Sequence, residues 1–317
     1  MFKKKVLTSA LVLSLGVMAA CGADEEEGTN GDTEGDSADG ATEEQEYEEL
    51  VMGFVPSTDS DQIASTVEPL TERLSEELGI DVEGTVMTNY SALVEAMGSG
   101  QVQIGFIPAF GYVLANDRYD IEVILKSMRN GDSSYRAQYS VRADSGIETL
   151  ADLEGKVWAF ADSASTSGYI FPGAQTIIDN DLESSDDLDN FFGDMVETGS
   201  HDNALVTVLE GGADFATTFE DAREVIEGDY PEVFDEENGL VQLDFTDPIP
   251  NDTISVIPSL SDDMVDRIRE AFLSFNDDED MIQIMNDVYR WDAIAEAEDS
   301  EYDVVREAAE FFDIGLD

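Results

Sequence analysis

Basic residues, histidine and cysteine are scarce in this chain of 317 residues. It contains 15 lysines and arginines against 73 aspartates and glutamates, with one histidine and one cysteine. The formal net charge of −58 excludes nucleic acids and anionic membrane surfaces as partners, because both are bound through basic patches. A single cysteine allows no disulfide within the chain. With only one histidine as well, the chain has too few ligands for a transition-metal site. We therefore expect no metal and no cofactor.

The apolar run at the N-terminus is short. Residues 1–20, MFKKKVLTSALVLSLGVMAA, carry three lysines and then an apolar stretch of about 14 residues, too short to span a bilayer at 1.5 Å per residue. This composition is typical of a secretory signal peptide. The run ends in VMAAC, which resembles the lipobox of bacterial lipoproteins with Met18 at the usual leucine position. The resemblance implies that Cys21 is lipidated and anchors an extracytoplasmic protein to the cell membrane; an ordinary cleaved signal peptide is the alternative.

Residues 21–47 are rich in acidic residues and hold almost no apolar side chains. Such a segment cannot bury enough surface to offset the entropy of ordering it, which predicts a disordered acidic tether. The remaining residues, about 270 of them, are enough for one large domain or two of ordinary size.

The acidity extends along the whole chain. Loss of Lys3, Lys4 and Lys5 with the signal peptide would take the net charge from −58 to about −61. Ions screen such repulsion to a few ångströms at high salt, so we interpret the composition as a halophilic adaptation. The alternative is an acidic protein that stays soluble at ordinary salt.

From residue 49 onward, apolar runs alternate with amphipathic stretches. Residues 49–55, ELVMGFV, predict a buried strand, and the following stretch predicts a helix with its N-cap at Ser57, Thr58 or Asp59. The apolar residues of this helix fall at helical spacing: Ile63, Val67, Leu70, Leu74 and Leu78. Further strands are predicted at 80–87, 101–108, 155–162, 192–200 and 213–219. The alternation indicates an α/β fold with a largely parallel sheet, whose ligands bind beyond the carboxyl ends of the strands.

The stretch ADSASTSGYIFPG, residues 161–173, follows one of these predicted strands and opens a helix. It holds four hydroxyl side chains: Ser163, Ser165, Thr166 and Ser167. The unpaired N–H groups of a first helical turn, beside hydroxyl donors, favour an anion site that needs no lysine or arginine. A plain helix cap, which uses only one hydroxyl, is the alternative. Pro172 predicts a kink, or a restart of the helix after a single turn.

Three motifs carry a resemblance to a known family: STSGYIFPG, ETGSHDNALVTVLEGGADFATTF and DPIPND. With the supporting stretches GFVPSTD, YSALVEAMGSGQVQIGFIPAFGYVLA and YRAQYSVRADSGIETLADLEGK, they are similar to the phosphonate-, phosphite- and phosphate-binding lipoproteins of ABC importers, over nearly all of residues 48–260. The resemblance implies a type II periplasmic-binding-protein fold, in which two α/β lobes hold the ligand in a cleft. We expect lobe 1 at 48–145 and 248–317 and lobe 2 at 146–247, with crossovers near 145 and 248.

The resemblance also implies the ligand-binding residues. Ser165, Thr166 and Ser167 would hold the oxyanion, and His201 would contact it. Tyr90 and Tyr135 would line the cleft. Glu220 or Asp221, and Asp252, lie near positions where aminophosphonate binders place carboxylates for an ammonium group. Purely structural roles are the alternatives: His201 could cap its helix, and the two tyrosines could be packing residues.

The function implied is that of a monomeric extracytoplasmic binding protein. It would capture phosphonate, phosphite or phosphate and deliver the ligand to a permease and its ATPase. A binder of another small anion or organic solute and a structural surface lipoprotein are alternatives. A hydrolase of phosphate esters is a further alternative, but STSG lacks the G-x-S-x-G elbow and the sequence has no Walker loop, so we expect no enzyme.

Overall fold

The computed structural model of the chain describes residues 47–312. The predicted signal peptide at 1–20, the lipidation site Cys21 and nearly all of the predicted tether at 21–47 lie outside these residues. In the described range no helix has the length and apolar character needed to cross a membrane.

One sheet has six strands in the order β13-β4-β12-β3-β1-β2. Their bounds are β1 Glu49–Phe54, β2 Asp81–Val86, β3 Ile104–Ile107, β4 Glu122–Met128, β12 Thr253–Val256 and β13 Ala293–Glu296. β1 pairs in parallel with β2 and β3, whereas β12 is antiparallel to both β3 and β4, and β13 is antiparallel to β4. The predicted largely parallel sheet is therefore a mixed sheet, because chain segments from the C-terminal quarter insert into it.

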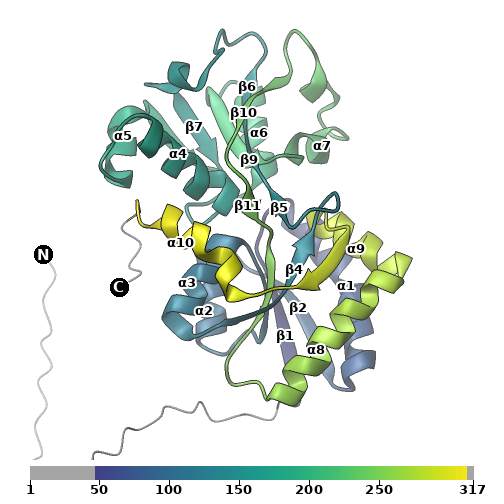
Figure 1. The fold of residues 1–317 in the computed structure, drawn as a ribbon. Coiled ribbons are helices and arrows are strands. Elements are labelled where there is room, and N and C mark those ends of the chain that lie inside the picture. Colours follow the sequence, from purple (N-terminus) through teal and green to yellow (C-terminus); the bar gives the residue numbers. More distant parts are fainter. Residues whose placement is uncertain (1–46, 313–317) are drawn as a thin grey trace, which may run out of the picture. The chain divides into compact units, whose positions relative to one another are not determined.

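Six helices pack around this sheet in the part of the chain that the structure describes (Figure 1). They are α1 Ser60–Leu78, α2 Tyr90–Gly98, α3 Ala109–Tyr119, α8 Asp262–Ser274, α9 Glu279–Tyr289 and α10 Asp303–Ala309. The first helix matches the prediction: Asp59 is the N-cap and accepts a hydrogen bond from the N–H of Gln62. Its buried residues are the five predicted from helical spacing, Ile63, Val67, Leu70, Leu74 and Leu78. The apolar stripe thus fixes which face of α1 meets the sheet.

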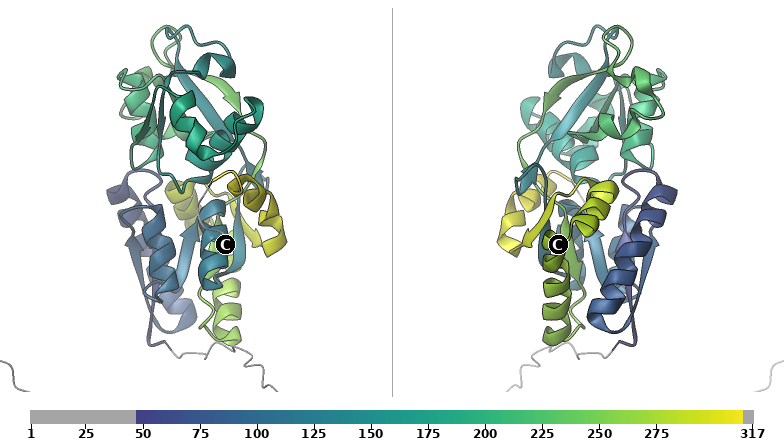
Figure 2. Two further views of the ribbon diagram at one scale, coloured as in Figure 1. Left: turned by 90° about the vertical axis from the view of Figure 1, so that its left-hand side faces the viewer. Right: turned by 90° about the vertical axis from the view of Figure 1, so that its right-hand side faces the viewer.

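The second sheet has five strands in the order β10-β6-β9-β7-β8. Their bounds are β6 Ala137–Arg142, β7 Val157–Phe160, β8 Asp194–Glu197, β9 Phe215–Phe219 and β10 Leu240–Phe245. The helices that follow these strands are α4 Phe171–Asp179, α5 Leu188–Phe191, α6 His201–Leu209 and α7 Ala222–Ile226. β7 is parallel to β8 and β9, and β6 is antiparallel to its neighbours β9 and β10. Helices pack around both sheets, which confirms the predicted α/β class (Figure 2).

The chain passes between the two sheets at a short ladder. β5, Ser134–Tyr135, pairs antiparallel with β11, Ile249–Pro250. We call residues 47–133 and 252–312 lobe 1 and residues 136–248 lobe 2, and propose these as the two domains. The expected crossover near 145 comes about ten residues after the β5–β11 ladder, because β6 already pairs with β9 in the second sheet.

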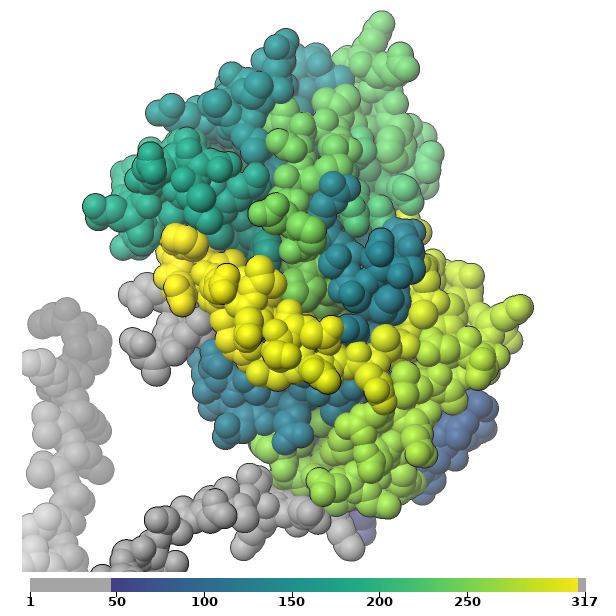
Figure 3. All heavy atoms as spheres, viewed as in Figure 1, coloured from purple at the N-terminus to yellow at the C-terminus, as the bar shows by residue number. Residues whose placement is uncertain are grey.

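The C-terminal segment joins lobe 1 to lobe 2 a further time. Phe312 packs on the Tyr169 ring, with 5.4 Å between centroids, and the N–H of Ser185 donates to the carbonyl oxygen of Phe311. Figure 3 shows this segment in yellow, lying across the face of the molecule from lobe 1 to lobe 2. The tail was expected to belong to lobe 1 alone, and its last described residues contact lobe 2 as well.

Candidate ligand-binding site

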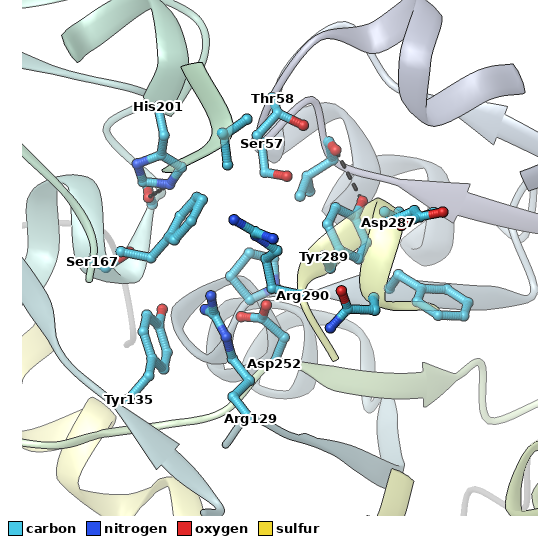
Figure 4. Close-up of a pocket in the computed structure, with 18 of the residues that line it drawn as sticks. Ser57, Thr58, Arg129, Tyr135, Ser167, His201, Asp252, Asp287, Tyr289 and Arg290 are labelled. Atoms are coloured by element: carbon cyan, nitrogen blue, oxygen red, sulfur yellow. Dashed lines mark hydrogen bonds between the residues drawn. The ribbon is translucent and has the colours of Figure 1, made fainter. Parts of the chain in front are cut away.

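A cavity of about 230 Å³ lies between the two lobes. Six of the predicted site residues line it: Tyr90, Tyr135, Ser165, Ser167, His201 and Asp252. Thr166, Glu220 and Asp221 are not among the lining residues. Figure 4 shows the labelled side chains of Arg129, Tyr135, His201, Asp252 and Arg290 directed toward the same space. The sequence motifs, far apart along the chain, therefore meet in one site.

The serine-rich turn forms one wall of the cavity. Thr166–Ile170 is a single turn of π-helix, and α4 begins directly after it with Pro172 in its first turn. The helix restarts there, which is one of the two outcomes predicted from Pro172. Ser165 is the N-cap, and its Oγ accepts a hydrogen bond from the N–H of Gly168 at 3.0 Å. Ser167 lines the cavity and is almost fully buried.

Thr166 is engaged with lobe 1. Its Oγ1 accepts a hydrogen bond from the backbone N–H of Phe110, at the start of α3, at 2.9 Å. Its side chain is fully buried. The three hydroxyls of the turn thus have three different environments: one caps the helix, one bridges the lobes and one faces the cavity.

His201 is the first residue of α6 and faces the same cavity. Its Nε2 lies 3.4 Å from the Oγ of Ser165, and its Nδ1 has no hydrogen-bond partner among residues 47–312. Burial, and then the positive charge of Arg129, lower the pKa of His201 to about 3. The imidazole is therefore neutral near pH 7, with one ring N–H to donate.

The close approach of Ser165 and His201 does not make a catalytic pair. A triad needs a carboxylate at the Nδ1 of the histidine, and no described residue bonds to that atom. The approach depends instead on Gly168, where an added Cβ would lie 2.8 Å from Ser165 Oγ and 3.4 Å from His201 Cε1. Glycine at this position lets the turn and α6 come together.

Two tyrosines supply buried hydroxyls. Tyr90 and Tyr135 are 2% and 5% exposed, and the hydroxyl of Tyr90 has no hydrogen-bond partner within the described part of the chain. Burial raises the pKa of both hydroxyls, so both stay protonated. A protonated phenol without a partner is a donor that an oxyanion can satisfy.

The carboxylates predicted near an ammonium group are paired with arginines. Glu220 lies 3.4 Å from Arg136, and Asp221 lies 3.6 Å from Arg129. Asp252 lines the cavity; burial raises its pKa to about 6, although Arg129 and Trp291 oppose the rise. Of the two candidates left open by the sequence, Asp221 is the one whose carboxylate pairs with an arginine that lines the cavity.

The sequence predicts an anion site that needs no lysine or arginine, and it does not reveal that two arginines line the cavity. Arg129 and Arg290 both line the cavity, and Arg129 is only 5% exposed. Sequence reasoning missed Arg129 because it lies outside the resembling motifs. A usable signal existed, since Arg129 directly follows β4 and ligand-binding residues gather at the carboxyl ends of strands.

Several hydrogen bonds join the lobes around the cavity. The N–H of His201 donates to the carbonyl oxygen of Ser57 at 3.0 Å, and the N–H of Tyr90 donates to the Asp162 carboxylate at 3.3 Å. With the Phe110–Thr166 bond, these contacts hold the lobes together beside the cavity.

The model of one protein family matches residues 52–302, and that family is described as the periplasmic phosphonate substrate-binding proteins of ABC transporters. The chain is 26% identical over 222 residues to the phosphate-import protein PhnD of Mycolicibacterium smegmatis, and the match covers 68% of this chain and 65% of that protein. It is 24% identical over 238 residues to the phosphonates-binding periplasmic protein of Escherichia coli, covering 73% and 68% of the two chains.

Solved structures show the same fold. A binding-protein component of a phosphonate ABC transporter from Pseudomonas aeruginosa has a TM-score of 0.73 at 22% identity, covering 83% of this chain and 86% of that one. PhnD1 of Prochlorococcus marinus in complex with methylphosphonate has a TM-score of 0.71 at 18% identity, covering 83% and 97%. The arrangement of two lobes around a ligand cleft is thus the type II periplasmic-binding-protein fold.

Proposed function

Because the chain belongs to the family of periplasmic phosphonate-binding proteins of ABC transporters, we propose that it captures phosphonate, phosphite or phosphate in the cavity between its lobes. This family consists of transport binding proteins, not enzymes. The liganded, closed form would deliver the anion to a permease and its ATPase, and hinge motion at the β5–β11 ladder would open and close the cleft.

One observation carries this proposal: in a strongly acidic protein, the cavity between the lobes is lined by a set of hydrogen-bond donors, beside the carboxylates of Asp252, Glu224 and Asp287. The donors are the hydroxyls of Ser167, Tyr90 and Tyr135, the neutral imidazole of His201 and the guanidinium groups of Arg129 and Arg290. Each hydrogen bond to a charged group is worth about 1.5–3 kcal/mol. A compact oxyanion with several acceptor oxygens can satisfy such a set, whereas an apolar or cationic solute cannot.

The cellular setting of this proposal comes from the sequence. The signal peptide and the lipidation of Cys21 would hold the protein on the outer face of the cell membrane, where a tethered monomer meets its ligand before the permease does. Mass spectrometry of the membrane-extracted protein tests the anchor. A diacylglycerol-modified N-terminal Cys21 is expected, and a soluble product that begins elsewhere would contradict it.

Calorimetric titration with methylphosphonate, phosphite, phosphate and sulfate tests the binding. At least one phosphorus oxyanion is expected to bind at one site per chain, and sulfate more weakly. A phosphate ester recovered unchanged, as followed by ³¹P NMR, is the outcome expected of a binder. Hydrolysis of the ester, or no binding of any phosphorus oxyanion, would contradict the proposal.

Ser163→Ala is a matched control for Ser167→Ala. Ser163 lies in the loop just before the turn that holds Ser167, but Ser163 is exposed and Ser167 faces the cavity. Only the Ser167 substitution is expected to weaken binding.

A further inference from the structure

Arg129 is held in place by its own backbone. Its N–H donates to the carbonyl oxygen of Asp132, and the N–H of Asp132 donates back, at 3.0 and 2.9 Å. Asn130 and Gly131 between them have positive φ angles of 53° and 81°, as in a two-residue hairpin turn. The side chain of Asn251 clamps the turn by donating to the carbonyl oxygens of Ser127 and Asp132, both at 2.9 Å. The arginine therefore enters the cavity from a rigid support.

The surroundings of the Arg129 guanidinium are those that proteins offer to a cation. It lies 5.3 Å from the ring centroid of Tyr135 and 5.0 Å from that of Phe219, within the range of cation–π attraction. Its Nη2 is 3.6 Å from the carboxylate of Asp221, and its charge also acts on Asp252. Two aromatic rings and two carboxylates thus surround a positive group that the protein itself supplies.

The Nη2 atom of this guanidinium is buried and lacks a hydrogen-bond partner among the described residues. Arg129 as a whole is only 5% exposed. Buried donors of this kind are rare unless a ligand or water satisfies them. Figure 4 shows the guanidinium directed into the cavity beside Asp252. The unsatisfied donor points to an anionic ligand atom.

We propose that Arg129 occupies the place that a cationic group of the ligand would otherwise take, so that the site selects phosphorus oxyanions without an amine and rejects aminoalkylphosphonates. This inference rests on the proposed function. The ammonium of an aminoalkylphosphonate would find Asp221 already paired with Arg129, Asp252 under the influence of the same guanidinium, and a like charge fixed beside both carboxylates. Methylphosphonate, phosphite and phosphate carry no such group, and they gain the free donor of Arg129.

The direct test compares methylphosphonate with 2-aminoethylphosphonate on the wild-type protein by calorimetry. We expect methylphosphonate to bind at least about 100-fold more tightly, because Arg129 repels the ammonium group of 2-aminoethylphosphonate. Equal affinities, or a preference for the amine, would overturn the inference while leaving the proposed function standing. Binding of neither ligand, nor of phosphate or phosphite, would overturn both.

Substitutions test the role of the charge itself. Arg129→Gln is expected to weaken methylphosphonate binding by about tenfold to 100-fold, the loss of a charge-assisted hydrogen bond, and to strengthen 2-aminoethylphosphonate binding about tenfold. Arg129→Lys keeps the charge and should keep the preference for methylphosphonate. Equal weakening of both ligands by Arg129→Gln would contradict the inference.

Two further variants act as controls. Arg136→Gln removes an arginine that also pairs with a neighbouring carboxylate, Glu220, outside the cavity, and should change neither affinity. Adding both Asp221→Asn and Asp252→Asn to Arg129→Gln should abolish the gain for 2-aminoethylphosphonate, because the freed carboxylates are what would hold the ammonium. A gain that persists without both carboxylates would assign the effect to space rather than charge and would overturn the inference. Thermal unfolding of each variant shows whether it is folded.

Discussion

The guanidinium of Arg290, which follows α9 in lobe 1, lies 3.1 Å from the Glu224 carboxylate of α7 in lobe 2. Both residues line the cavity, and their side chains are 34% and 60% exposed. They form the more solvent-accessible part of the lining, where an ion pair can join the lobes once the cleft has closed.

Arg290→Gln removes both this ion pair and a positive charge from the cavity. We expect it to weaken oxyanion binding about tenfold, mainly through faster dissociation. Glu224→Gln breaks the same pair but leaves the charge of Arg290 for the ligand, so its effect should stay within about fivefold, as for an exposed salt bridge. Stopped-flow dissociation rates of both variants check this. A larger loss from Glu224→Gln than from Arg290→Gln would contradict it.

The hydroxyls of Thr166 and Ser167 should have separable effects. Ser167→Ala removes a donor to the ligand and is expected to weaken binding by about 1.5–3 kcal/mol. Thr166→Val removes the acceptor for the N–H of Phe110 and should destabilise the closed form by about 1–3 kcal/mol, the cost of an unsatisfied buried donor. Small-angle scattering with and without ligand would separate the two. A Thr166→Val protein that closes like wild type would contradict the bridging role.

The pKa of Asp252, raised to about 6, makes binding dependent on pH. Below pH 6 the side chain is protonated and resembles asparagine, whereas above it a negative charge faces the ligand. Asp252→Asn should therefore bind methylphosphonate about tenfold more tightly than wild type at pH 8, and the two affinities should converge below pH 6. The ligand's own ionisation cancels in this ratio. A ratio that stays constant from pH 8 to pH 5 would show that Asp252 does not titrate in this range.

The net charge of −58 predicts a strong dependence of stability on salt. At 0.01 M salt the carboxylates repel one another over about 30 Å, and at molar salt over about 3 Å. The melting temperature should therefore rise steeply from dilute buffer to molar salt, as expected of a halophilic adaptation. Circular dichroism melts at a series of salt concentrations check this, and a flat profile would contradict the adaptation.

Local sequence patterns were sufficient to predict the helices that carry one apolar stripe. The spacing of Ile63 to Leu78 gave the buried face of α1, and Pro172 gave the restart at α4. These features depend on neighbours a few residues apart, which the sequence displays directly.

Crossovers and the antiparallel strands could not be predicted in the same way. Whether β6 pairs with β9 or ends lobe 1 depends on contacts more than 70 residues apart, and the insertion of β12 between β3 and β4 depends on still longer ones. A short apolar run is compatible with either sheet, so the predicted boundary at 145 fell on the wrong side of β6.

The candidate site was predicted in part. The family resemblance implied Ser165, Ser167 and His201, and all three line the cavity. The separate role of Thr166 and the place of Arg129 in the cavity could be recognised only from the folded structure, since their partners Phe110 and Asp221 come from other parts of the chain. The position of Arg129 directly after a strand could have marked it as a candidate, but its burial depends on contacts from other parts of the chain.

The most direct test of the oxyanion site uses His201, the single histidine of the chain, as its own reporter. In ¹⁵N NMR of the untagged protein, one imidazole should remain neutral from pH 8 down to about pH 4, since its pKa lies near 3. Addition of methylphosphonate or phosphate should shift these signals until one equivalent has bound. An imidazole that titrates near pH 6.5 and does not respond to any phosphorus oxyanion would contradict the central claim that this cavity is an oxyanion-binding site.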